Sequence, residues 1–505
     1  MTFRRLLVTA LLASAGILLL LTTDYWLTNF IGAISFIFSI VAFVIAVTIF
    51  LENRHPAHTI SWLFLLAFNP MIGFVFYILF GQKFRKQRKF HKKAILDDQA
   101  FAQLNFKNDE QGFQQLLSRG NHWQKLFQLA QNIGKTPVSF HTDTKVLTNG
   151  DETFAEIKRC LKQARHHIHM EYYIVRNDEL GREIKDILIE KAKSGVEVRF
   201  LYDGVGSWTL PRSYIREMRQ AGVRIYPFFP VRIPWFNNRI NYRNHRKIIV
   251  IDGDVGFIGG LNIGDEYLGK NLYFGFWRDT HLWVYGEAVR SLQLIFLRDW
   301  FYNTDEHFDA EKYLTETKAK GEMLGGVQMV AGGPDQDWEV IKHLFFAMIV
   351  SAKKSIWIAS PYFVPDEDIL SALKVAALSG VDVRMLVPAR PDKRMVFYAS
   401  RSYFTELLEA GARIFAYQDG FMHSKILIID HELASIGSSN MDLRSFHLNF
   451  EVNAFLYHSA SVKKLVQDYM EDLKHSKEIE LQAFQKRPIY QRVFESFSRL
   501  ASPLL

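Results

Sequence analysis

Residues 244–253 read NHRKIIVIDG, an apolar run that opens on three basic side chains and closes on an aspartate. The run has the length and the residue types of a buried strand. His245 and Lys247 are two positions apart, so in a strand they lie on the same face. Buried strands seldom begin with cations unless the strand end faces a negatively charged group. The stretch therefore predicts a strand whose N-terminal end binds an anion.

The same pattern occurs twice. HRKIIVIDGDVGFIGGLN at residues 245–262 matches HSKILIIDHELASIGSSN at residues 423–440. Both copies read His, any residue, Lys, four apolar residues, Asp, six residues, Gly, a small residue, any residue, Asn. A single His-x-Lys at a strand end is weak evidence, but two copies with one spacing are specific. The repeat predicts two copies of one fold. The N-terminal ends of the two motif strands would together form one site.

The segments around the motif repeat as well. SGVEV at 194–198 matches SGVDV at 379–383, and AGVRIY at 221–226 matches AGARIF at 410–415. In both copies a strand pattern, a helix pattern and another strand pattern follow one another, which implies right-handed crossovers. We therefore expect two α/β domains, at 140–320 and 321–505, each with a mixed, mainly parallel sheet flanked by helices.

Before residue 140 the chain has a different character. Three apolar runs, at 6–23, 30–51 and 60–81, indicate two to three transmembrane helices in an N-terminal membrane region, 1–81. Pro70 interrupts the third run and should kink it. A basic linker with helices follows at 82–139, and its first part, QKFRKQRKFHKK, favours the cytoplasmic side for what comes next. Three full crossings would conflict with the basic residues Arg4 and Arg5, so the number of crossings stays open.

Overall composition limits the partners and the chemistry. The 505 residues are 49% hydrophobic and carry a formal net charge of +8, which suits an anionic partner. Cys160 is the single cysteine, so the chain has no internal disulfide and no cysteine-based zinc site.

The doubled motif supplies a metal-free set of groups for a phosphate. Two imidazoles, two ammonium groups, a hydroxyl and two amides can surround its oxygens; they belong to His245, His423, Lys247, Lys425, Ser438, Asn262 and Asn440. Two histidines can divide the labour of displacement at phosphorus. One attacks and forms a phosphohistidine. The other protonates the leaving oxygen and then deprotonates the acceptor.

Each histidine needs a group that fixes its tautomer, usually a carboxylate. Asp279 in FWRDTHLWV and Glu451 in NFEVNAFLY are the candidates, since both are charges within strand-like runs. The alternative is a salt bridge to Arg278 or Arg444. Asp252 and Asp430 close their apolar runs, which favours hydrogen bonding in a loop or helix cap.

An insertion precedes the first motif. PFFPVRIPWFNNRINYRN at 227–244 has no equivalent in the second copy, and it interleaves aromatic and arginine residues. One interpretation is a loop on the domain core. The other is a membrane-facing lip, in which the aromatics Phe228, Phe229, Trp235 and Phe236 enter the interfacial layer beside Arg232, Arg239 and Arg243.

The paired His-x-Lys-x4-Asp pattern resembles the phospholipase D superfamily, and the match over nearly the whole chain is similar to the bacterial cardiolipin synthases within it. The phrases that carry this resemblance include NGDETF at 149–154, WRDTH at 277–281, SPYFVPD at 360–366 and GSSNMDLRSFHLNFE at 437–451. The extra N-terminal apolar run departs from the common two-span pattern.

The resemblance implies that two phosphatidylglycerol molecules become cardiolipin and glycerol without metal, nucleotide or other cofactor. It implies a multi-pass protein of the bacterial cell membrane with cytoplasmic catalytic domains and anionic lipids as partners. By motif match the catalytic set is His245, Lys247, Asp252, His423, Lys425 and Asp430. Asn262, Ser438 and Asn440 would bind the phosphate, and Asp279 and Glu451 would orient the histidines.

Other functions remain open at this point. A phospholipase D hydrolase, or another phosphatidyltransferase such as a phosphatidylserine synthase, would differ only in the acceptor. A nuclease of the same superfamily is disfavoured by the membrane spans and by few basic aromatic platforms, so no nucleic acid partner is expected. A non-catalytic scaffold is disfavoured by the intact His and Lys in both copies. The sequence does not specify the oligomeric state.

Overall fold

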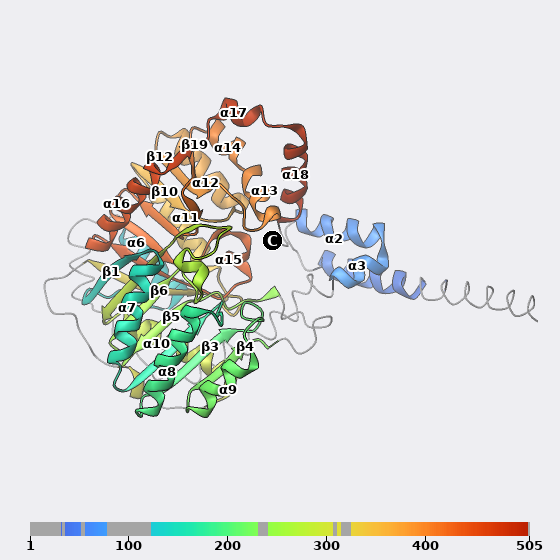
Figure 1. The fold of residues 1–505 in the computed structure, drawn as a ribbon. Helices are drawn as coiled ribbons and strands as arrows, with labels where there is room; N and C mark the ends of the chain where they lie inside the picture. Colours follow the sequence, from blue (N-terminus) through green and yellow to red (C-terminus); the bar gives the residue numbers. More distant parts are fainter. Residues whose placement is uncertain are drawn as a thin grey trace, which may run out of the picture. The chain divides into compact units, whose positions relative to one another are not determined.

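The computed structural model describes residues 32, 36–51, 56–77, 123–230, 241–306, 311–314 and 325–502 (Figure 1). The chain divides into two compact units, a small N-terminal helical unit and a large α/β unit. The apolar run at 6–23, the basic stretch at 82–93 and residues 231–240 of the insertion lie outside the described residues.

The N-terminal unit consists of short apolar helices. Residues 36–51 are helical, and they are followed by α2 (Pro56–Phe68) and α3 (Pro70–Phe76). The third apolar run is broken at Asn69, as expected for a proline that has no amide hydrogen to continue the helix. Among the described residues, no helix is both long and apolar enough to span a bilayer.

The first half of the α/β unit forms a seven-stranded sheet in the order β1-β8-β6-β5-β2-β3-β4. Its strands are β1 (Thr142–Thr148), β2 (His167–Tyr172), β3 (Glu197–Asp203), β4 (Arg224–Phe228), β5 (Ile248–Ile251), β6 (Val255–Gly259) and β8 (Thr280–Gly286). Its helices are α7 (Asn149–Gln163), α8 (Glu179–Lys193), α9 (Arg212–Gln220) and α10 (Val289–Thr304).

The second half repeats this order in an eight-stranded sheet, β19-β13-β12-β10-β15-β16-β18-β9. Its strands are β9 (Gly326–Gly332), β10 (Ser355–Ala359), β12 (Asp382–Pro388), β13 (Arg413–Tyr417), β15 (Ile426–Ile429), β16 (Leu433–Gly437), β18 (Glu451–Tyr457) and β19 (Ser476–Glu478). Its helices include α11 (Val340–Ser351), α12 (Glu367–Leu378), α13 (Arg394–Ser402), α14 (Phe404–Glu409), α16 (Ala460–Lys474), α17 (Leu481–Gln485) and α18 (Ile489–Leu500). The predicted repeat is therefore visible strand by strand, with β5 matching β15.

Both sheets are mixed, but the expected parallel majority is wrong. Only β2, β3 and β4 in the first sheet, and β10, β12 and β13 in the second, pair in parallel. The motif strand β5 instead forms a hairpin with β6 and is antiparallel to β2. The hairpin follows from the Asp-Gly turn, in which Asp252 and Gly253 have φ of 55° and 77°. Such turns join antiparallel neighbours.

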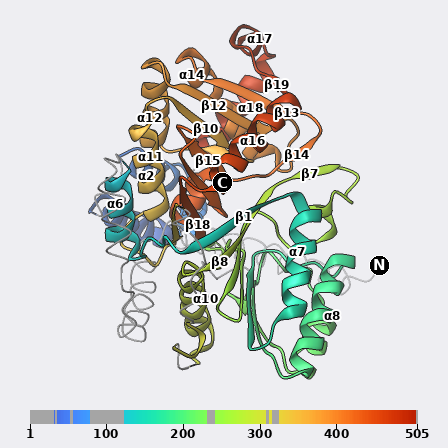
Figure 2. The same ribbon diagram turned by 90° about the vertical axis from the view of Figure 1, so that its left-hand side faces the viewer.

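Helices cover the sheets on alternate faces, and Figure 2 shows α7 and α8 on one side of the first sheet with α10 on the other. The motif strand is buried on both faces. Ile249 and Ile251 pack into the cluster beneath α7, α8 and α9, whereas Ile248 and Val250 join a central cluster. This central cluster also contains residues of β15, β16 and α16, so the two halves share one core.

One short strand pair and one isolated β-bridge join the halves at the motifs. β7 (Phe276–Arg278) pairs in parallel with β14 (Gly420–Met422), directly before His423. On the other side, the His245 amide donates to the Phe450 carbonyl at 2.9 Å, and the Phe450 amide donates to the Arg243 carbonyl at 2.8 Å. Each motif therefore begins where its chain crosses to the opposite half.

Candidate functional site

The two motif histidines are bound by carboxylates from opposite halves. His245 Nδ1 lies 2.9 Å from Glu451 Oε2, and His423 Nδ1 lies 2.6 Å from Asp279 Oδ2. Both carboxylates are fully buried. Asp279 follows the first motif in sequence but serves the second histidine, and Glu451 does the reverse. The site is therefore a single structure that neither half can build alone.

The structure does not show the alternative salt bridges of Asp279 and Glu451 to Arg278 and Arg444. Arg278 contacts Asp472, with Nε to Oδ1 at 2.7 Å. Its guanidinium bonds to Asp279 at the main-chain carbonyl and not at the carboxylate. Arg444 donates to the Asn241 carbonyl at 2.9 Å. Asp279 and Glu451 instead accept from imidazole Nδ1–H, so the lone pair of each ring is on Nε2. In His423 this nitrogen lies 3.2 Å from Lys425 Nζ.

Burial controls the charge of the site. It lowers the pKa of His245 to about 4, with Glu451 opposing the change and Lys247 adding to it. Burial and then Lys425 lower the pKa of His423 to about 4. Burial acts to raise the pKa of Glu451, but His245, Lys247 and Ser438 together outweigh it and hold the pKa below its usual value. At neutral pH both rings are therefore neutral, as a nucleophile must be, beside ionised carboxylates.

The two lysines stand next to the histidines. Lys247 Nζ donates to the His245 carbonyl at 2.6 Å, and Lys425 Nζ donates to the His423 carbonyl at 2.5 Å. Burial lowers the pKa of Lys247 to about 7 and that of Lys425 to about 8. Lys425 also lowers the pKa of His245 in the other half, so the four side chains share one electrostatic environment. An arriving phosphate anion would relieve the mutual repulsion of these cations.

Ser438 binds a carboxylate in this structure. Its hydroxyl donates to Glu451 Oε2 at 2.5 Å and accepts from the Val452 amide at 2.9 Å. The first copy has Gly260 at this position, where a Cβ would lie 2.1 Å from Asp279 Oδ1. The two carboxylates are therefore held differently, Glu451 by a serine hydroxyl and Asp279 by the Thr280 amide at 2.8 Å.

The two motif asparagines also differ. The Asn262 amide is used within its own half: Oδ1 accepts from the Ile174 amide at 3.1 Å, and Nδ2 donates to the Tyr267 hydroxyl at 3.1 Å. Asn440 Oδ1 is buried without a hydrogen-bond partner among the described residues. Of the two, Asn440 is the one with an amide group left to turn toward a substrate.

Asp252 and Asp430 lie at the opposite ends of β5 and β15 from the histidines. Asp252 accepts from the amides of residues 165, 166 and 167 at 2.8, 2.7 and 2.9 Å. Asp430 accepts from residues 353, 354 and 355 at 2.9, 2.7 and 2.8 Å. Each carboxylate ties the motif hairpin to the start of the neighbouring strand. These contacts fit the loop role that their place in the run favours. Their membership of the catalytic set, which motif matching implies, stays a prediction.

Replacing Asp252 with alanine should destabilise the protein without changing the chemistry. Loss of three hydrogen bonds to a carboxylate is expected to lower the free energy of unfolding by about 2–4 kcal/mol. Thermal unfolding of the purified protein in detergent measures this loss. The stability of Asp252→Asn should lie between those of the parent and of Asp252→Ala. The rate per folded molecule should stay within about twofold of the parent. A thousandfold loss of rate in a protein of unchanged stability would contradict the assignment.

Several aromatic residues near the histidines were not singled out from the sequence. The Tyr173 ring centroid lies 5.0 Å from that of His245, and Trp277 lies 4.9 Å from His423. Tyr173 in EYYIV and Tyr362 in SPYFV occupy equivalent places in the two copies. Alignment of the two copies could therefore have identified this tyrosine position as a candidate for the site. Tyr362 donates to Asp392, and Lys247 lies over the Tyr173 ring.

The insertion is only partly described, and its described part contradicts the lip. Phe228 and Phe229 are buried and pack against Phe450. Arg243 is buried 3.7 Å from Asp203. The beginning and the end of the insertion therefore belong to the core, because the chain must cross to the second half there. Trp235, Phe236, Arg232 and Arg239 lie outside the described residues.

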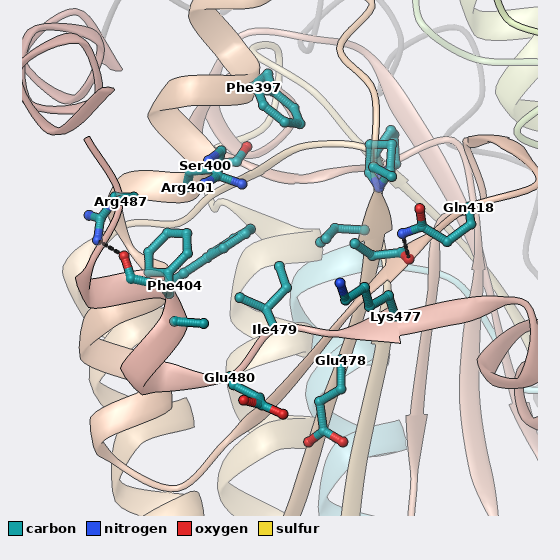
Figure 3. A pocket seen from close by; sticks show the side chains of 17 residues that line it. Phe397, Ser400, Arg401, Phe404, Gln418, Lys477, Glu478, Ile479, Glu480 and Arg487 are labelled. Atoms are coloured by element: carbon teal, nitrogen blue, oxygen red, sulfur yellow. Dashed lines mark hydrogen bonds between the residues drawn. The ribbon is translucent and has the colours of Figure 1, made fainter. Parts of the chain in front are cut away.

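A cavity of about 530 Å³ in the second half contains no motif residue. Figure 3 shows Phe397, Phe404 and Ile479 lining it, with Arg401 and Arg487 at one side. Among the described residues, no group of three or more His, Cys, Asp and Glu side chains could hold a metal ion.

Two pseudo-symmetric halves, each of which contributes a carboxylate-bound histidine and a lysine, fit the class of enzymes that transfer phosphoryl-type groups. The family model for "Cardiolipin synthase, PLD-like domain" matches residues 157–300 and 345–475, and a phospholipase D-nuclease N-terminal model matches residues 37–82. The chain belongs to the cardiolipin synthase family of the phospholipase D superfamily, and it is a phosphatidyltransferase.

Relatives match from end to end. A cardiolipin synthase of Geobacillus sp. (strain WCH70) is 63% identical over 96% of this chain and 97% of its own length. One of Alkalihalophilus pseudofirmus is 60% identical over 100% of this chain and 99% of its own. Among solved structures, a phosphatidylserine synthase of Haemophilus influenzae covers 75% of this chain and 98% of its own, with 15% identity and a TM-score of 0.57. That likeness supports the fold.

Proposed function

We propose that the protein joins two phosphatidylglycerol molecules into cardiolipin and glycerol at the surface of a bacterial membrane. The crossed arrangement of His245 with Glu451 and His423 with Asp279 supports the proposal, because each histidine is bound at Nδ1 by a carboxylate of the other half and so keeps Nε2 for chemistry at phosphorus. The substrates of this membrane-associated enzyme are phospholipids, as its family implies. Two to three N-terminal spans and catalytic domains in the cytoplasm complete the proposal.

The first half-reaction forms a phosphohistidine. His245 Nε2 attacks the phosphorus of the first phosphatidylglycerol, and the bond between phosphorus and the terminal glycerol oxygen breaks. His423, protonated at Nε2, donates its proton to that oxygen, and glycerol leaves. The substrate phosphodiester raises the pKa of His423 from its low value in the empty site, because its negative charge lies beside the ring. Lys247 and Lys425 stabilise the charge that develops on the phosphoryl oxygens.

The second half-reaction reverses these roles. His423 removes the proton from the glycerol hydroxyl of a second phosphatidylglycerol, whose oxygen attacks the phosphorus. The bond between phosphorus and His245 Nε2 breaks, and cardiolipin leaves. In this mechanism the Asn440 side-chain amide donates to a phosphoryl oxygen, whereas Ser438 and Asn262 act by holding Glu451 and the first half in position.

Purified protein with phosphatidylglycerol alone should yield cardiolipin and glycerol in equal amounts. Mass spectrometry of the lipids and an enzymatic glycerol assay measure both products. The same yield is expected with excess chelator, because the proposed groups for the phosphate are all side chains. Phosphatidic acid as the main product would indicate the second candidate, a hydrolase. Loss of activity that one specific metal restores would contradict the metal-free mechanism.

A further inference from the structure

The last helix of the chain carries an exposed apolar stripe. On α18 the large exposed side chains are those of Ile489, Tyr490, Val493, Phe494, Phe497 and Leu500. Their spacing places them along one face of the helix. The opposite face is buried: Glu495 and Ser498 are 2% and 0% exposed. A soluble surface seldom leaves a stripe of this size uncovered.

The exposed charges within the segment that carries this stripe are of one sign. Glu406 of α14, which is partly exposed, is paired with Arg499 at 2.8 Å. Glu495 is the only acidic residue between 481 and 505, and it is held inside by Arg401 Nε at 3.2 Å and Arg487 Nη2 at 2.7 Å. Lys486 and Arg492 are exposed. An amphipathic helix with exposed aromatics and only cations exposed matches an anionic lipid surface better than a protein groove.

The stripe continues toward the catalytic site. α18 lies along α13 (Figure 1), with Phe494 against Tyr398 at 4.8 Å and Arg499 Nη1 3.5 Å from the Ser402 carbonyl. This parallel register directs the start of α18 toward the start of α13, where three more exposed cations stand, Arg390, Lys393 and Arg394. Asp392 between them is occupied by the Tyr362 hydroxyl.

A loop of the first half reaches this corner. The Tyr273 hydroxyl donates to the Pro391 carbonyl at 3.0 Å, and Leu272, Tyr273 and Phe276 are exposed. The next residue is Trp277, which packs on His423. Apolar side chains and cations therefore run from α18 to the edge of the site.

We propose that α18 and the loop at 271–276 form a bilayer-docking face that lies in the headgroup layer of anionic lipid and delivers substrate to His423. The cations bind phosphate groups, and the apolar side chains enter the acyl boundary. This inference rests on the proposed function only for the identity of the substrate, a bilayer lipid. Docking itself follows from the stripe and its charges.

Spin labels in the full chain test the docking directly. Cys160 is buried and is first replaced by alanine. Nitroxides are then attached at Val493→Cys and Phe497→Cys, which are 63% and 61% exposed. Matched controls on α12 are Val375→Cys and Leu378→Cys, 60% and 72% exposed. In phosphatidylglycerol vesicles the α18 labels should collide with oxygen and not with a water-soluble nickel chelate, and the controls should do the reverse.

Two other outcomes would overturn the proposal. Labels on α18 that collide with the nickel chelate would show that the stripe faces water. Labels shielded from both reagents would show that protein covers it, either the N-terminal helices or a second copy. Neither measurement needs turnover, so a failed phosphatidyl transfer reaction would leave this result intact.

Activity provides an independent readout. The pair Val493→Ser and Phe497→Ser should lower the rate on bilayer phosphatidylglycerol by about tenfold, the order expected when two apolar side chains are removed from an interface. The rate on a short-chain, monomeric analogue should not change, which also shows that the variant folds. The pair Val375→Ser and Leu378→Ser should leave both rates unchanged. Equal rates of the α18 pair and the parent on bilayers would contradict the proposal.

Discussion

Replacing either His245 or His423 with alanine should reduce phosphatidyl transfer by about four orders of magnitude or more. Each ring is held at Nδ1 by a buried carboxylate of the other half, so its loss removes either the nucleophile or the acid of the proposed mechanism. His475, which is partly exposed and 2.5 Å from Asp419, provides a matched control. His475→Ala should remain within about twofold of the parent.

The two alanine variants should differ when the leaving group changes. A phosphatidyl ester of nitrophenol has a leaving group that needs no proton, so the general acid becomes dispensable in the first step. With this substrate His423→Ala should release nitrophenol in a burst and accumulate a phosphatidyl adduct on His245. His245→Ala should give neither. An adduct on His423 in the His245→Ala variant would reverse the assignment, and full activity of either variant would end the two-histidine mechanism.

The sequence predicts the repeat and the motif strands because their signals are local. The continuous apolar run of β5, the Asp-Gly turn after it and the spacing of His245 and Lys247 all lie within ten residues. The parallel majority failed for a related reason. Strand–helix–strand patterns predict parallel pairs correctly, but the antiparallel pairing of β5 with β2 joins residues far apart in sequence and leaves no local pattern.

The partners of the site residues were harder to predict. Sequence order suggests that Asp279 serves the preceding His245, but β7 pairs with β14 and places it beside His423. Motif matching predicts that Ser438 binds the phosphate, whereas in the structure its hydroxyl donates to Glu451. In both cases the decisive contact joins two different strands. The tertiary fold sets which strands are neighbours, and residue spacing in the sequence does not predict it.

Variants of Glu451 and Asp279 should test the crossed pairing, because each should impair the reaction step that depends on the histidine of the other half. Glu451→Gln and Asp279→Asn keep the shape of the side chain but remove the charge that fixes the Nδ1–H tautomer and stabilises the charged ring. By analogy with other carboxylate–histidine pairs, each should cost about 10²–10⁴-fold in rate. Both side chains are fully buried, so circular dichroism and thermal unfolding must show that the amide variants fold.

The nitrophenyl substrate then separates the two variants. Asp279→Asn weakens the acid, His423, so the activated leaving group should restore most of the first step and the adduct on His245 should form. Glu451→Gln weakens the nucleophile, so the burst should stay slow with either substrate. Ser438→Ala removes one hydrogen bond from Glu451 and should show the same pattern with a smaller loss, about tenfold. If each carboxylate served the histidine of its own half, Asp279→Asn would resemble the nucleophile variant and Glu451→Gln the acid variant. The opposite pattern is required by the distances of 2.6 and 2.9 Å across the two halves.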